Sequence, residues 1–192
     1  DFAQDGQVNG TLASRQPGSS IKPVNYAVAL SNGFTPATII DDSPITYQVP
    51  GQKPYSPRNY DNQFHGQVTL RTALASSFNI PAVKTLATFG VAKMIDLGQK
   101  MGITTWDDPS RFGLSLTLGG GEVKMIDLAI VYATLANQGL RVDLHPILKV
   151  TDWRGKVFDQ LNCSTPCNPQ AVLNPHIAYQ LTDILSDNLA RA

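Results

Sequence analysis

The spacing of apolar residues along the chain predicts a mostly helical protein. The clearest case is the segment 122–137, where apolar residues recur three or four positions apart: Met125, Leu128, Ala129, Tyr132, Leu135 and Ala136. This period matches one face of an α-helix, and Gly139 follows where a helix commonly ends. The pattern therefore predicts an amphipathic helix over 122–137.

Weaker versions of the same signals predict further helices. Residues 20–31 form an apolar stretch with Pro23 in its first turn, where a missing N–H does little harm, and Asn32-Gly33 supplies a stop. Four more helices are predicted at residues 69–77, 81–90, 91–102 and 174–189. The second of these begins at Pro81 and the last begins with Asn174-Pro175, both of which favour a helix start.

The remaining segments predict a long loop and a hairpin. Residues 34–66 are rich in Pro, Gly, Asn and Tyr and hold no sustained period, so we expect an ordered loop with one short strand near 45–49. A loop of that length in a compact domain is usually functional. Residues 145–160 alternate between apolar and polar and contain an Arg-Gly turn, which predicts a β-hairpin.

Composition restricts the class of protein. The 192 residues suffice for one sizeable core, and 15 basic and 15 acidic residues leave no net charge to attract nucleic acid or an anionic membrane surface. No run of 18 apolar residues exists, so the chain predicts no membrane span. It starts without methionine and stops inside a predicted helix, so we expect a piece of a longer protein.

The cysteines and histidines do not predict a metal site. Cys163 and Cys167 form an isolated C-x₃-C pair, whereas structural zinc needs four ligands. A small disulfide loop is the favoured interpretation, with free thiols as the alternative, and it points to an extracytoplasmic location. We expect His65 to order the long loop, Trp106 and Trp153 to pack, and no metal or cofactor to bind.

A candidate nucleophile lies at the start of the first helix. Ser19 and Lys22 are three residues apart, which on a helix sets both on one face with Cβ atoms about 5–6 Å apart. A neutral lysine amine there can take the proton of the serine hydroxyl and make it a nucleophile. The free N–H groups of a helix start are also the donors that an oxyanion hole needs. The alternative is a surface serine and lysine without a catalytic role.

A second polar pair lies at a break between predicted helices. Ser77 and Asn79 stand between the helices at 69–77 and 81–90, where both can face a cleft. The alternative is that Asn79 only caps the helix that begins at Pro81.

Three segments in this order give these residues a context: RQPGSSIKP at 15–23, YSPRNYDNQFHGQVTLRTALASSFNIPAVK at 55–84 and LGGGEVKMIDLAIVYATLANQG at 118–139. Together they resemble the transpeptidase domain of the class A, bifunctional penicillin-binding proteins. The resemblance covers nearly the whole chain. It implies that residues 1–192 are a partial transpeptidase domain of α+β class. They would form the active-site helix and helical subdomain of the serine β-lactamase/penicillin-binding fold, with a small antiparallel hairpin and most of the central sheet absent.

The resemblance also implies roles. Ser19 would be the acylated nucleophile, Lys22 its base, Ser77 a proton relay, and Asn79 the residue that holds the substrate's peptide amide. The family cleaves the D-Ala-D-Ala bond of a peptidoglycan stem peptide and passes the acyl group to an amine of a neighbouring stem, without a cofactor. β-Lactams mimic the dipeptide. The implied parent is bacterial, extracytoplasmic and membrane-anchored, with a glycosyltransferase domain upstream.

Two departures from the family pattern matter. Ser186-Asp187-Asn188 spells the family's Ser-Asp-Asn motif, but it lies in the last predicted helix without the expected flanks, so we prefer Ser77 and Asn79. The family's Lys-Thr-Gly strand is absent. We therefore expect the isolated chain to be inactive, with the apolar back of the Ser19 helix uncovered and prone to self-association.

Other functions remain open at this point. A D,D-carboxypeptidase or a β-lactamase-like hydrolase would use water in place of the amine. A β-lactamase also needs a deacylating carboxylate, and Glu122 is the only glutamate in the chain. A non-catalytic β-lactam sensor or a binding scaffold is the non-enzymatic alternative.

Overall fold

The fold is built around one central helix. The computed structural model describes residues 3–4, 6–48, 51, 53–163 and 167–191. Helix α1 (Lys22–Ser31) lies in the middle of the helical body, and every residue from Lys22 to Leu30 is buried. A helix that is apolar nearly all round is stable only when it is enclosed. The other helices surround it: α2 (Leu70–Ala75), α3 (Asn79–Phe89), α4 (Val91–Lys100), α5 (Met125–Ala136) and α6 (Pro175–Ser186).

Four short 3₁₀ turns complete the helical part: η1 (Gly18–Ile21), η2 (Pro109–Arg111), η3 (Leu114–Leu118) and η4 (Asn188–Ala190). The predicted helices are present, with shifted ends. The helix predicted to begin at Pro81 begins at Asn79. The last predicted helix ends at Ser186, because the Asp187 side chain accepts hydrogen bonds from the N–H groups of Leu189 and Ala190 and starts η4.

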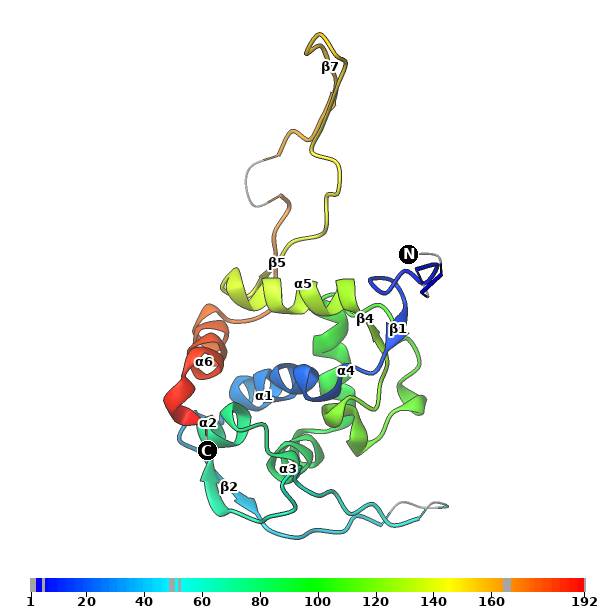
Figure 1. The fold of residues 1–192 in the computed structure, drawn as a ribbon. Helices are drawn as coiled ribbons and strands as arrows, with labels where there is room; N and C mark the ends of the chain where they lie inside the picture. Colours follow the sequence, from blue (N-terminus) through cyan, green and yellow to red (C-terminus); the bar gives the residue numbers. More distant parts are fainter. Residues whose placement is uncertain (1–2, 5, 49–50, 52, 164–166, 192) are drawn as a thin grey trace.

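The described strands form only antiparallel pairs. These are β1 (Ser14–Arg15) with β4 (Val123–Lys124), β2 (Ile39–Asp42) with β3 (Gly66–Thr69), β5 (Leu140–Arg141) with β8 (Gln170–Ala171), and β6 (Lys149–Thr151) with β7 (Val157–Gln160). The described residues thus contain no larger sheet, in agreement with the expected α+β class. The predicted hairpin at 145–160 is confirmed as β6–β7, in an arm that projects beyond α5 (Figure 1).

The strand expected near residues 45–49 lies earlier in the chain. β2 ends at Asp42, and Pro44 then interrupts the ladder because it has no N–H to donate. In the predicted segment, Tyr47 forms only an isolated bridge with Tyr55. The long loop from 43 to 65 is therefore an excursion between two paired strands.

The apolar surface left exposed is not where the sequence predicted it. The helix that follows Ser19 has no uncovered back, because α3, α4 and α6 pack around α1. Exposed apolar side chains instead lie on α5, where Met125 is 63% exposed and Tyr132 is 37% exposed. Further exposed apolar side chains lie on the arm that carries β6 and β7, among them Ile147, Leu148 and Phe158, so the self-association that we expected would involve α5 or this arm rather than α1.

The two tryptophans differ. Trp106 is fully buried in the core, as predicted. Trp153 was expected to pack, but it lies in the β6–β7 turn and is 86% exposed, with the guanidinium of Arg154 over its ring.

The sulfur atoms of Cys163 and Cys167 are in contact, as the disulfide interpretation expects, with Cα atoms 5.3 Å apart. None of the helices in the described ranges is long and apolar enough to cross a bilayer.

The contact between α4 and Trp106 gives a test of the packing. Gly98 lies in α4, where alanine would normally favour the helix by about 1 kcal/mol. A Cβ there would lie 2.5 Å from Cζ3 of Trp106, and the buried ring has no room to move away. We expect Gly98→Ala to destabilise the fold by about 1–3 kcal/mol in urea unfolding.

The exposed Ala92 of the same helix provides the control. Ala92→Gly changes helix propensity alone and should cost no more than about 1 kcal/mol. A Gly98→Ala variant as stable as the unmodified protein would show that α4 and Trp106 do not pack as described.

Candidate active site

Lys22 is the centre of the candidate site. It is the first residue of α1 and is 1% exposed. Its Nζ lies 2.5 Å from the backbone oxygen of Ser77, 3.1 Å from Ser77 Oγ and 2.8 Å from Asn79 Oδ1. The structure thus brings three of the four predicted site residues together across the break between α2 and α3.

Burial changes the protonation of Lys22. Desolvation of the ammonium lowers its pKa from 10.5 to about 8. At pH 7 about a tenth of the molecules then carry a neutral amine, compared with less than about a thousandth for an ordinary lysine. A neutral amine has two N–H groups and one lone pair. The carbonyl of Ser77 and Oδ1 of Asn79 can accept both N–H groups, which leaves the lone pair to accept a proton from a hydroxyl.

Ser77 occupies a position that usually belongs to glycine. Its φ is 59°, in the left-handed region. The N–H of Ser77 bonds to the carbonyl of Leu74 and the N–H of Phe78 to that of Ala73. These two bonds form the Schellman motif that ends a helix, in which the left-handed residue is most often glycine. A strained serine in this position suggests that the hydroxyl is needed there.

Asn79 does not cap its helix. The N-terminal capping position of α3 is Phe78, which has no side-chain acceptor. Asn79 instead accepts from Lys22 with Oδ1 and donates through Nδ2 to the carbonyl of Arg58, at 2.8 Å. The alternative interpretation of Asn79 as a simple cap is therefore wrong.

Ser19 stands apart from this cluster. It lies in η1 and is exposed, and within the described part of the chain its hydroxyl makes no hydrogen bond. The direct Ser19–Lys22 hydrogen bond that the spacing suggests is absent from this structure, because Lys22 is turned towards Ser77 and Asn79. Ser77 is exposed as well, so both hydroxyls are open to solvent above the buried amine.

The glycine-rich turn after η3 supports the segment that carries Ser19. A Cβ on Gly119 would lie 2.3 Å from the backbone nitrogen of Gly18, so the two backbones are in direct contact. The hydroxyl of Tyr132 donates to the carbonyl of Ser20 at 2.9 Å. Gly18 and Gly119 both have a positive φ, which glycine tolerates best. The two glycines thus allow the close approach that holds Ser19 at the surface.

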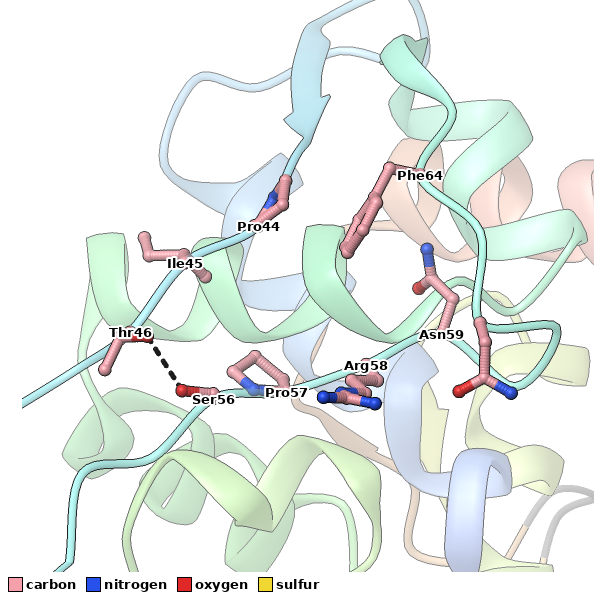
Figure 2. A pocket seen from close by; sticks show the side chains of 9 residues that line it. Pro44, Ile45, Thr46, Ser56, Pro57, Arg58, Asn59 and Phe64 are labelled. Carbon is pink, nitrogen blue, oxygen red and sulfur yellow. Dashed lines mark hydrogen bonds between the residues drawn. The ribbon is translucent and has the colours of Figure 1, made fainter.

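A cavity of about 450 Å³ adjoins the cluster from the long loop. Figure 2 shows Pro44, Ile45 and Thr46 on one side and Ser56, Pro57 and Arg58 on the other, with Asn59 and Phe64 also lining it. Arg58 and Asn59 both contact Asn79 through polar atoms. The cavity is therefore next to the candidate site, but Ser19, Lys22 and Ser77 do not line it.

The Ser186-Asp187-Asn188 motif has a structural role. The carboxylate of Asp187 pairs with Arg71 of α2 at 2.9 Å and caps η4, while the Ser186 hydroxyl donates to the carbonyl of Asp183. These contacts hold the end of α6 against α2. The choice of Ser77 and Asn79 over this motif is consistent with the geometry.

Sequence analysis missed two residues of the site. The Asn59 side chain accepts from the N–H groups of Asn79 and Ile80, at 2.8 and 3.2 Å. Asp42 is fully buried and is bonded by Asn59 and by His65, which orders the loop as expected. The only available signal was that the loop is too long to be an idle connection, and this signal does not single out particular residues.

Three comparisons place the chain among known proteins. A family model described as "Penicillin binding protein transpeptidase domain" matches residues 5–189. Penicillin-binding protein 1A of Neisseria meningitidis serogroup B is 35% identical over 193 residues, covering 97% of this chain and 24% of the relative. Penicillin-binding protein 1A of Rickettsia bellii is 35% identical over 189 residues, covering 92% of this chain and 23% of the relative. The chain thus spans about a quarter of the length of these curated relatives.

Solved structures share the fold. The crystal structure of penicillin-binding protein 1A from Haemophilus influenzae superposes with a TM-score of 0.82 at 25% identity, covering 95% of this chain and 31% of that chain. PonA1 from Mycobacterium tuberculosis, in complex with penicillin V, gives a TM-score of 0.77 at 23% identity, covering 92% of this chain and 48% of that chain. At this level of identity the PonA1 match shows the fold alone.

The buried lysine should make stability depend on pH. The pKa of Lys22 is about 8 when folded and near 10.5 when unfolded, so between these values the unfolded state binds more protons. The free energy of unfolding should therefore rise with pH across this window, by about 3 kcal/mol in total. Below pH 8 the folded protein carries the full cost of burying the charged Lys22 ammonium. The measurement is urea unfolding at several pH values, with Lys22→Met as the reference. A pH dependence that is the same in both proteins would contradict the buried amine.

The left-handed backbone of Ser77 gives a second test. Ser77→Ala and Ser77→Gly remove the same hydroxyl, but only glycine relieves the strain at a φ of 59°. We expect the glycine variant to be more stable than the alanine variant by about 1 kcal/mol. Thermal unfolding of the two variants measures the difference, and an alanine variant that is equally stable would show that the turn is not strained.

Proposed function

Because this chain belongs to the penicillin-binding protein transpeptidase domain family, we propose that it forms the nucleophile-bearing part of a penicillin-sensitive D,D-transpeptidase that cross-links peptidoglycan stem peptides. The observation that carries the proposal is the buried Lys22, which is bonded to Ser77 and Asn79 and follows the exposed Ser19 by three residues in the chain.

The proposed reaction begins with acylation of Ser19. Its Oγ attacks the carbonyl carbon of the D-Ala-D-Ala peptide bond, and its proton passes to the neutral amine of Lys22. Since Lys22 is bonded to Ser77, the Ser77 hydroxyl carries the proton on to the leaving amine of the terminal D-Ala. The products are an ester on Ser19 and free D-Ala. An amine of a second stem then attacks the ester, and Ser19 regains its proton.

Asn79 would orient the substrate. Its Oδ1 accepts from Lys22 and one N–H of its Nδ2 is bonded to the carbonyl of Arg58, which leaves the second N–H for a peptide carbonyl. The side chain is thereby fixed before substrate arrives, which lowers the entropy lost on binding.

The proposal extends to the setting of the whole protein. The chain covers only 24% of a relative such as the Neisseria protein. We propose a longer bacterial, extracytoplasmic protein, membrane-anchored and with an upstream glycosyltransferase domain, whose partners are stem peptides and β-lactams. Hydrolysis as a D,D-carboxypeptidase or β-lactamase is the alternative. Glu122 makes no contact with Lys22, Ser77 or Asn79 within the described residues, so nothing in the geometry favours the β-lactamase.

Covalent labelling tests the proposal. In the complete natural polypeptide that contains these residues, a fluorescent penicillin should attach to the peptide that holds Ser19. Ser19→Ala should abolish the adduct, and Lys22→Arg should slow it by about 10²–10⁴-fold, because arginine stays protonated. Mass spectrometry of the digested protein locates the adduct. An adduct that survives Ser19→Ala would refute the assignment.

The 192-residue chain alone is the comparison in the same assay. It lacks the Lys-Thr-Gly strand, and the loss of one oxyanion donor typically slows acylation by about 10²–10³-fold. We expect little or no label on the isolated chain. Equal labelling of the isolated chain and the complete polypeptide would show that the strand is not needed.

A further inference from the structure

A buried carboxylate lies behind the candidate site. Asp42, the last residue of β2, is 0% exposed. Its two oxygens accept from the Asn59 amide at 2.8 and 2.9 Å, and Oδ2 also accepts from the backbone N–H of His65 and lies 2.6 Å from His65 Nδ1. A buried carboxylate is costly unless such donors surround it. The roles proposed above for Ser19, Lys22, Ser77 and Asn79 do not involve this carboxylate.

Asn59 connects this carboxylate to the site. Because Asp42 accepts and does not donate, the Asn59 amide nitrogen must face Asp42, and the Asn59 oxygen must face α3. That oxygen accepts from the backbone N–H groups of Asn79 and Ile80. Helix α3 has no cap of its own at Phe78, so Asn59 supplies the cap from the long loop.

His65 supports the same turn from another direction. Its ring stacks on Phe78, the residue between Ser77 and Asn79, with centroids 4.0 Å apart and planes inclined by 13°. Its Nδ1 contacts Asp42, and its Nε2 lies 3.1 Å from the carboxylate of Asp61. The imidazole is therefore held at both nitrogens while its face supports Phe78.

We propose that Asp42, Asn59 and His65 are positioning residues that fix the Ser77–Asn79 turn against Lys22. Asn59 bonds to the backbone of the turn and His65 stacks on Phe78, while Asp42 holds both Asn59 and His65 in place. They act through Ser77 and Asn79 and touch no substrate. This inference rests on the proposed function and adds the group that sets its geometry.

The turn needs such support because its own conformation is strained. Ser77 is in the left-handed region, and its carbonyl and hydroxyl must both stay within reach of Lys22 Nζ. A displacement of about 1 Å at a reacting group can reduce a rate by about 10²-fold. In Figure 2, Arg58 and Asn59 lie in the wall of the cavity, on the loop segment that bonds to Asn79.

Exchanging the donor and the acceptor tests the connection. Asn59→Asp keeps the size and the acceptor for α3, but it places a second carboxylate oxygen against Asp42, where the amide now lies 2.8 Å away. Adding Asp42→Asn restores one donor and one acceptor between positions 42 and 59 in reversed order, whereas the bond from the Asn59 amide to the Gln63 carbonyl stays lost. In the complete natural polypeptide, we expect Asn59→Asp to slow acylation at saturating penicillin by about 10–100-fold, and the double variant to recover part of that loss.

Gln48→Glu is the matched control, since it makes the same change from amide to carboxylate on the same loop at an exposed side chain that neither contacts Asp42 nor lines the cavity. It should acylate at the unmodified rate. The apparent affinity before acylation is measured beside the rate, and the larger change should be in the rate, because the positioning residues act on the turn that meets Lys22. All rates are measured below the unfolding temperature of the least stable variant.

The outcomes separate the inference from the proposed function. Slow Asn59→Asp with rescue by the double variant supports the positioning role. Asn59→Asp at the unmodified rate, or a folded double variant that stays slow, overturns it. If Asn59→Asp alone does not fold, the double variant decides in the same way. An unmodified protein that takes no label refutes the proposed function, and the inference with it.

Discussion

The structure depends on one constraint, which is that the amine of Lys22 must be kept out of water and still be surrounded by oxygen atoms. Among the described residues Nζ has three such neighbours, which come from Ser77 in the break between α2 and α3 and from Asn79 at the start of α3. A buried ammonium is stable only when acceptors replace its water shell, and even then its pKa falls, here to about 8. The enclosure of α1, the left-handed Ser77 and the polar loop behind Asn79 all serve to place these three oxygens.

The helices and the loop divide this work between them. Buried apolar side chains of α1, such as Val24 and Val28, fix the helix that carries Lys22 by burial in the core. They cannot orient a polar turn, because hydrophobic contact has no direction. Directed hydrogen bonds do so, and they come from Asn59 and Arg58 of the long loop to Asn79. The loop is anchored to the buried carboxylate of Asp42 through Asn59, so it is more than a connection between strands, as its length had led us to expect.

Much of this arrangement could be predicted from the sequence, and the reason for each failure is physical. Local periodicity predicted the helices, since an apolar face repeats within one element, and the hairpin followed from its turn. Long-range hydrogen bonds leave no such pattern, so the link from Asp42 through Asn59 to Asn79 could not be anticipated. The same limit explains why the 19–22 spacing suggested a Ser19–Lys22 contact, whereas Lys22 reaches Ser77 and Asn79, more than 50 positions away. Whether α1 would be covered depended on the packing of α3, α4 and α6, which no single segment reveals.

The central claim is that burial lowers the pKa of Lys22 into the range where a neutral amine is present. Carbon-13 labelling of the lysines followed by NMR titration reads this value directly from the chemical shift of the Lys22 Cε, which Lys22→Met assigns by loss of its signal. A midpoint near 8, well separated from the exposed lysines near 10.4, is the result that the structure predicts. A midpoint that coincides with the exposed lysines would mean that the amine is solvated, and the account of the site would be wrong.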